Sequence, residues 1–242
     1  DEADAAQSIF NKRLMPLAKN QTFFTADELK KAIENLDSEE VFKSGLGCVS
    51  IENPVRRTDG RMIPIEEIKK ISEYCRGKNI KLHLDGARLF NALVAKEQSP
   101  KEYGQVFHSI SICLSKSLGA PVGSLLLGPN DFIKKARRVR KVFGGGMRQA
   151  GFLAAAGIYA LENNVDRLKE DHQHAKMIAD ALSRKNFVQE VLPVETNIII
   201  FHLTKEMGAK DLVAKLREKD ILSYAIAPYS VRFVLHLDIT PQ

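Results

Sequence analysis

Apolar and polar residues alternate in several short stretches of the chain, and between these stretches apolar residues recur every three or four positions. Residues 80–85, IKLHLD, alternate regularly, which predicts a half-buried β-strand. Residues 65–78 place Ile65, Ile68 and Ile71 on one face, which predicts an amphipathic α-helix. Further strands are predicted at Cys48–Glu52, 109–114 and 122–127, and further helices at 28–35, 131–143 and from Met147 onward with a break near Asn163. Strands and helices in this alternation indicate a mostly parallel sheet covered on both faces.

The pattern changes after about residue 186. The segments TNIIIFHL and SVRFVLHL predict strands, and KDLVAKLREKD between them predicts a helix. We therefore expect an α/β fold with two domains. A large domain would span residues 1–162, and a connecting helix with a smaller α+β domain would span residues 163–242.

Composition narrows the class of protein. The 242 residues are 44% hydrophobic and 27% charged, which is ordinary for a soluble protein with a sizeable core. The longest apolar run has twelve residues, from Ala150 to Leu161, and is too short to span a bilayer, so no membrane partner is expected. The three cysteines are widely spaced and form no metal motif. They predict reduced thiols, a cytoplasmic location and no metal site.

Seven basic residues lie close together in the region of the helix predicted at 131–143. Together with the formal net charge of +6, they raise the hypothesis that the protein binds nucleic acid. Aromatic side chains that could stack on bases are not interleaved with these charges, which favours a solvated helix face and no nucleic-acid partner. The seven are Lys134, Lys135, Arg137, Arg138, Arg140, Lys141 and Arg148.

Two residues whose side chains could take part in a reaction follow predicted strands. Asp85 ends the strand at 80–85, and Lys116 stands between two apolar stretches that both predict core. Ligands of open α/β sheets bind outside the carboxyl ends of the strands, so both side chains could face one crevice. A lysine that forms a Schiff base and an aspartate that keeps a pyridine nitrogen protonated suit pyridoxal phosphate. From these two residues alone, a buried ion pair is an equally good interpretation.

Longer segments carry a resemblance to a known family. The segments LHLDGARLFNA, SICLSKSLGAPVGSLLLG and RKVFGGGMRQAGFLAAAGIYALENN are long and occur in order, and VETNIIIFHL and VRFVLHLD follow them. Together they resemble the low-specificity L-threonine aldolases. These are fold type I, aspartate-aminotransferase-like pyridoxal 5'-phosphate enzymes of the β-eliminating lyase group. The resemblance covers nearly the whole chain and implies cleavage of L-threonine or L-allo-threonine to glycine and acetaldehyde.

The resemblance also implies roles for five residues. Lys116 would be the cofactor lysine, and Asp85 would pair with the pyridine nitrogen. Arg88 and Arg232 would hold the carboxylate of the amino-acid substrate, for which the guanidinium fork has bidentate geometry. Arg148, after three glycines, would approach the cofactor phosphate of a neighbouring subunit. That last role implies a homodimer or homotetramer with shared sites.

The chain departs from the family pattern in places that keep two alternatives open. The Gly-Thr phosphate-binding turn and the ring-stacking histidine of the family are not found, so the chain is expected to be N-terminally truncated. Ser117 stands where the family usually has glycine. One alternative is a β-eliminating lyase that acts on another amino acid. The other is a truncated partner subunit that supports assembly without catalysis.

Overall fold

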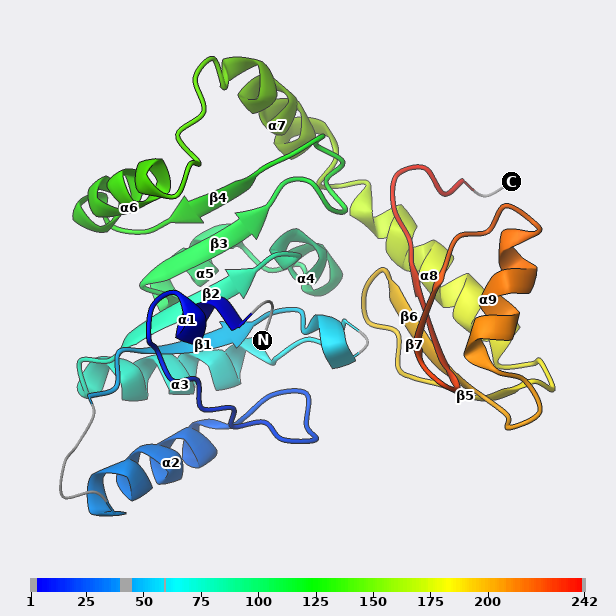
Figure 1. The fold of residues 1–242 in the computed structure, drawn as a ribbon, viewed down its shortest axis with the longest axis horizontal. Helices are drawn as coiled ribbons and strands as arrows, with labels where there is room; N and C mark the ends of the chain where they lie inside the picture. Colours follow the sequence, from blue (N-terminus) through cyan, green and yellow to red (C-terminus); the bar gives the residue numbers. More distant parts are fainter. Residues whose placement is uncertain (1–3, 40–44, 59, 241–242) are drawn as a thin grey trace.

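Two four-stranded sheets organise the chain, one in each half (Figure 1). The computed structural model describes residues 4–39, 45–58 and 60–240. The first sheet, in the order β1-β2-β3-β4, consists of β1 (Cys48–Glu52), β2 (Lys81–Gly86), β3 (Ser109–Cys113) and β4 (Ser124–Leu127). The second, in the order β5-β6-β8-β7, consists of β5 (Val188–Val191), β6 (Ile198–Leu203), β7 (Tyr224–Ala227) and β8 (Ser230–Val234). This confirms the predicted α/β fold, while the domain boundary at residue 162 stays a prediction.

The first sheet is mostly parallel, as predicted. Strands β1, β2 and β3 are parallel to one another, and β4 runs antiparallel to β3. The register pairs Glu52 with Asp85 and Asp85 with Ser111. The carboxyl ends of the three parallel strands therefore meet at one edge of the sheet, where a ligand site is expected.

Helices flank the first sheet. They are α1 (Ala5–Ser8), α2 (Ala26–Glu39), α3 (Ile65–Gly77), α4 (Leu89–Lys96), α5 (Pro100–Val106), α6 (Asn130–Val142) and α7 (Gly151–Asn163), with a 3-10 turn at Arg56–Thr58. Of these helices, α3, α4 and α5 carry the connections from β1 to β2 and from β2 to β3. In Figure 1, α2 and α3 lie below the sheet, whereas α6 and α7 lie beyond β4 at the top. The core of this half combines α2, α3, α4 and α5 with the inward residues of β1, β2 and β3.

Local sequence explains where α2 begins. The hydroxyl of Thr25 accepts a hydrogen bond from the Glu28 backbone N–H (3.2 Å), and the Glu28 carboxylate accepts one from the Thr25 N–H (2.7 Å). This reciprocal pair is a capping box, so the predicted capped start is confirmed. The helix is longer at both ends than the predicted 28–35.

The strand in the apolar stretch after Lys116 is exposed, so the expectation that the whole stretch belongs to the core is wrong; Leu118 and Ala120 are buried, but β4 is not. All four residues of β4 are exposed, including Leu125, Leu126 and Leu127. Among the described strands, β4 pairs with β3 alone, and its side chains lack a covering layer. The apolar pattern predicted the strand correctly but not its burial.

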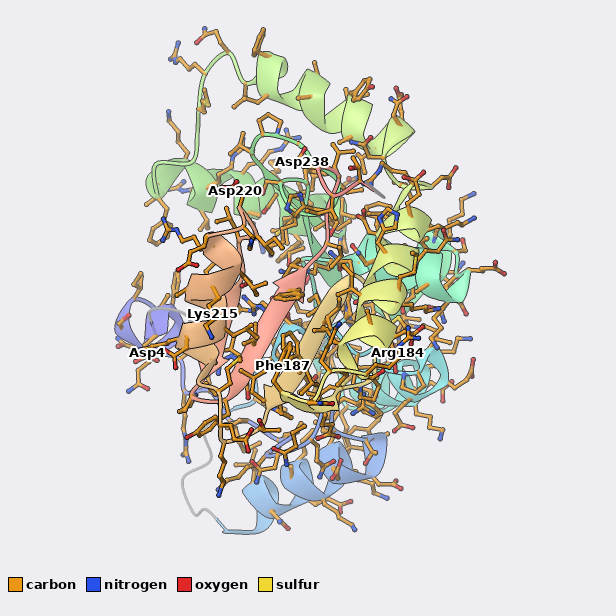
Figure 2. The ribbon with its side chains drawn as sticks, turned by 90° about the vertical axis from the view of Figure 1, so that its right-hand side faces the viewer. Asp4, Arg184, Phe187, Lys215, Asp220 and Asp238 are labelled. Atoms are coloured by element: carbon orange, nitrogen blue, oxygen red, sulfur yellow. The ribbon has the colours of Figure 1, made fainter. Side chains whose placement is uncertain are left out.

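The second sheet is covered by α8 (Leu168–Leu182) and α9 (Ala209–Arg217), which Figure 2 shows beside its strands. Five of the six residues of β6 are buried, which accounts for its almost continuous apolar sequence. The predicted break near Asn163 is confirmed, because α7 ends there and α8 begins five residues later. Within the described ranges, none of the helices combines the length and apolar character that crossing a membrane requires.

Candidate active site

A cavity of about 540 Å³ lies at the carboxyl edge of the first sheet. It brings together three of the residues singled out from the sequence, namely Asp85 at the end of β2, Arg88 just before α4, and Lys116 in the loop after β3. Glu52, Arg56, Arg57 and Ala87 complete the lining. The inference that Asp85 and Lys116 face one crevice is therefore confirmed. A direct ion pair between them is not among the contacts of the described residues.

Asp85 is held by the turn that follows its strand. The backbone N–H of Ala87 donates a hydrogen bond to Asp85 Oδ1 at 3.1 Å, and the side chain is otherwise exposed to the cavity. A carboxylate fixed by one backbone contact keeps the rest of its lone pairs available to a ligand. The site thus offers a preorganised acceptor at the end of β2.

Packing on both sides positions Lys116. Its neighbours Leu114, Leu118 and Ala120 are buried against residues of α7 and α8, while Lys116 itself is exposed to the cavity. The backbone N–H of Gly119 donates to the carbonyl of Lys116 at 2.9 Å, which closes a tight turn. Gly119 has φ +75°, a conformation that favours glycine. The loop is therefore firmly anchored and presents a single amine.

Two arginines carry buried N–H groups that have no hydrogen-bond acceptor among the described residues. The Nε and Nη1 of Arg88 and the Nε of Arg232, which lies on β8, are buried and have no hydrogen-bond partner among the described residues. The Arg232 guanidinium lies over the ring of Tyr224, 5.9 Å from its centroid. Buried donors of this kind are normally satisfied, and an anionic ligand bound here would satisfy them.

Electrostatics point to the same conclusion. Burial lowers the pKa of Arg88; Glu52 opposes that change, while the charges of Arg232 and Arg56 add to it. Burial also lowers the pKa of Arg232, and again Arg56 adds to the effect. Three guanidinium groups thus repel one another near one cavity. A carboxylate or phosphate placed among them would relieve this repulsion.

A second cavity, of about 390 Å³, adjoins the first because Arg88 and Lys116 line both. Its other wall consists of Val234, the last residue of β8, and the segment that follows it as far as Asp238. Asp238 is labelled in Figure 2, beyond the end of β8. The second half of the chain therefore contributes directly to the surroundings of Lys116.

Sequence reasoning missed Glu52, Arg56 and Arg57 as cavity residues. The available signal was that Glu52 ends a predicted strand next to the one that Asp85 ends. Burial raises the pKa of Glu52; the backbone N–H of Arg56 counteracts this with a hydrogen bond at 3.2 Å, and the charge of Asp85 raises the pKa further. Among the described residues, no group of three histidine, cysteine or acidic side chains could hold a metal ion.

The structure does not bring Arg148 to these cavities. It is exposed in the connection between α6 and α7 and lines neither of them. Several exposed apolar residues surround this connection, among them Phe143, Met147 and Phe152. Its role toward a neighbouring subunit stays a prediction.

The chain is similar to several known proteins. The sequence profile of the beta-eliminating lyase family matches residues 1–206. The chain is 43% identical over 195 residues to the probable low-specificity L-threonine aldolase 2 of Arabidopsis thaliana, a match that covers 79% of this chain and 55% of that protein. The chain spans about 55–62% of the length of the first curated relatives that it matches.

Solved structures show the same fold. A putative L-allo-threonine aldolase from Listeria monocytogenes superposes with a TM-score of 0.80 at 23% identity, covering 97% of this chain and 65% of that one. The histidinol-phosphate aminotransferase of Clostridium acetobutylicum superposes with a TM-score of 0.62 at 14% identity, covering 92% and 65%. These likenesses confirm the predicted aminotransferase-like fold.

Proposed function

The chain belongs to the beta-eliminating lyase family, and on that premise we propose that the protein is a pyridoxal-phosphate-dependent lyase. Its reaction would be the cleavage of L-threonine or L-allo-threonine to glycine and acetaldehyde. The names of the similar proteins support this reaction. The observation that carries the proposal is the shared cavity of Asp85, Arg88 and Lys116 at the carboxyl edge of the sheet.

The residues present fit pyridoxal 5'-phosphate. The cofactor needs an amine for its aldehyde, a carboxylate for its ring nitrogen and cationic donors for its anionic surroundings. Lys116 and Asp85 supply the first two from neighbouring strand ends. The unpartnered donors of Arg88 and Arg232 supply the third kind of contact, toward the cofactor or a substrate carboxylate.

Each residue then has a definite task. When bound, pyridoxal phosphate supplies an electron sink for the negative charge left on the substrate's Cα as the Cα–Cβ bond breaks. Asp85 accepts a hydrogen bond from the ring nitrogen and keeps the proton there. Arg88 and Arg232 bind the substrate carboxylate and so orient the Cα–Cβ bond. Lys116 holds the cofactor through its Nζ and is held in turn by the packed loop 114–120.

The decisive experiment is a product assay on the protein at its full natural length. The purified protein, loaded with pyridoxal phosphate, is incubated with L-threonine and with L-allo-threonine, and acetaldehyde and glycine are measured together. We expect equal amounts of both products. The Asp85→Asn variant should lose at least a hundredfold in rate, because the ring nitrogen would no longer be held protonated. Asp180→Asn, on the exposed face of α8, is the matched control.

Other products would identify the alternatives. A keto acid with ammonia, from threonine or from another amino acid, would show an eliminating lyase. A protein that binds the cofactor but converts no amino acid would be a non-catalytic subunit. Neither result is expected, because the similar proteins are named as threonine aldolases.

Assembly and location form the finer part of the proposal. We propose a homodimer or homotetramer in which Arg148 contacts the cofactor phosphate of a neighbouring subunit. Its exposed position supports this role, since it lines neither cavity of its own chain. The three cysteines are free, which supports a cytoplasmic location.

A further inference from the structure

A chain of buried polar side chains begins at the residue after Lys116. Ser117, Asn197, Asn91 and His172 are each at most 7% exposed. Asn197 Nδ2 donates to Ser117 Oγ at 3.1 Å, and Asn91 Nδ2 donates to Asn197 Oδ1 at 2.9 Å. Asn91 Nδ2 also lies 3.3 Å from His172 Nε2. Burying so many polar groups is costly unless all of them are paired, so the connections must be specific.

One backbone carbonyl determines how the side-chain amides of these hydrogen-bonded residues are oriented. Asn197 Nδ2 lies 2.7 Å from the carbonyl oxygen of Leu235, which can only accept a hydrogen bond. The amide nitrogen of Asn197 must therefore face Leu235, and its second hydrogen reaches Ser117. Asn197 Oδ1 is then an acceptor for Asn91. The amide groups have no equivalent alternative orientation.

Asn197 also connects the two halves of the candidate site. It makes two hydrogen bonds with Leu235. Its side chain donates to the Leu235 carbonyl, and its backbone carbonyl accepts a hydrogen bond from the Leu235 N–H at 2.9 Å. Leu235 is the first residue after β8, the strand that carries Arg232, and Ser117 follows Lys116 directly. Asn197 is thus hydrogen-bonded both to the loop that carries Lys116 and to the end of β8, the strand that carries Arg232.

We propose that Ser117 and Asn197 are positioning residues that hold Lys116 at a fixed place relative to Arg232. The inference deepens the proposed function and rests on it, because it gives these residues no chemistry of their own. The amine of Lys116 reacts only if it lies at the correct distance from the site that binds the substrate's carboxylate. A small displacement of the lysine therefore lowers the reaction rate. The Ser117 hydroxyl is the one side-chain contact that joins Asn197 to the lysine loop among the described hydrogen bonds.

The test compares two serine variants of similar burial in the full-length protein. Ser117→Ala removes the hydroxyl at the junction. Ser72→Ala removes a buried hydroxyl of α3, which donates to the Val106 carbonyl at 2.6 Å and lines neither cavity of the candidate site. Each protein is treated with pyridoxal phosphate and borohydride for increasing times, and the modified lysine is quantified by peptide mapping. The exchange rate of the Gly119 amide, which donates to Lys116, is measured without cofactor.

We expect Ser117→Ala to label Lys116 about threefold to tenfold more slowly than the parent, which corresponds to the loss of one buried hydrogen bond. The Gly119 amide should exchange faster by a similar factor. Ser72→Ala should leave the labelling rate and the Gly119 exchange rate unchanged, even if it lowers the melting temperature as much as Ser117→Ala does. This contrast separates positioning of the lysine from general stability.

Two results would overturn the inference in distinguishable ways. If Ser117→Ala and Ser72→Ala matched in labelling and in Gly119 exchange, the junction would be merely structural, and the proposed function would stand. If the parent protein were labelled at lysines other than Lys116, the proposed function would fail, and the positioning role would fail with it. Asn197→Ala provides a second variant, with a larger expected effect on both rates.

Discussion

Glu52 and Asp85 are partners in the parallel ladder of β1 and β2, so two carboxyl groups lie side by side at the edge of the cavity. Burial raises the pKa of Glu52, and the neighbouring charge of Asp85 acts in the same direction. The backbone N–H of Arg56 stabilises the charged form in part. In the folded protein, ionisation of Glu52 is therefore less favourable than ionisation of an exposed glutamate.

The Glu52→Gln variant should be more stable than the parent at neutral pH. A raised pKa in the folded state means that the folded protein holds this proton more tightly than the unfolded chain does, so the contribution of Glu52 to stability decreases as the pH rises. Glutamine removes that penalty and keeps an oxygen for the Arg56 N–H. The gain in melting temperature should disappear as the pH falls below about 4.3, where the unfolded carboxyl is also protonated. Thermal melts at several pH values, with exposed Glu190→Gln as control, would check this.

Lys116 should be the lysine that carries the cofactor. Borohydride reduction of the cofactor-loaded protein should fix the cofactor to the peptide that contains Lys116, and Lys116→Ala should abolish both the label and turnover. Lys134, exposed on α6, should remain unmodified. A label on Lys134 or Lys141 instead would remove the basis of the proposed site.

Arg88 and Arg232 should control the affinity for the substrate carboxylate. Replacing either by lysine keeps the charge but loses the bidentate fork, so KM for threonine should rise roughly tenfold to hundredfold, as expected for a lost charge-assisted contact. The exposed Arg217→Lys, at the end of α9, is the control. An unchanged KM in both site variants would place the carboxylate elsewhere.

Arg148 should act across a subunit boundary. Subunits with Arg148→Ala and subunits with Lys116→Ala should each be inactive alone, and their mixture should recover part of the activity. The reason is that a hybrid dimer would contain one site with neither substitution. Hybrids that form, as shown by tagged subunits, but recover no activity would contradict the shared site.

His172 should make the protein sensitive to acid. Burial lowers the pKa of His172 to about 4, with a smaller opposing effect of Asp171. Because the unfolded chain takes up the proton near pH 6.5 and the folded protein does not, stability should fall as the pH drops from about 6.5 to 4, by up to roughly 3 kcal/mol.

The His172→Gln variant tests this directly, since glutamine can accept from Asn91 but does not titrate in this range. Urea unfolding at several pH values should show that the variant lacks the acid-induced loss between pH 6.5 and 4. Parallel losses in variant and parent would assign the acid sensitivity to other groups.

The sequence by itself determined the elements whose apolar pattern is long or regular. The strand at Cys48–Glu52 has the predicted bounds, the helix predicted at 65–78 ends one residue earlier, and the strand predicted at 80–85 is shifted by one residue. Helices α4 and α5 were missed because they have eight and seven residues, too few for a helical period to be distinct. Asp85 and Lys116 were singled out by their positions after predicted strands, the resemblance added Arg88, and the fold brings all three to one cavity.

Tertiary structure alone decided burial and the contacts between distant segments. The apolar residues of β4 are exposed because its neighbours do not cover it, although its sequence is typical of a core strand. Asn91 and Asn197 are 106 residues apart and appear in the sequence as ordinary polar residues. Their burial, and with it the junction that reaches Ser117, exists only because α4, the lysine loop and the end of β8 pack together. A local pattern records the polarity of a side chain, whereas its partners depend on which remote segments the fold places beside it.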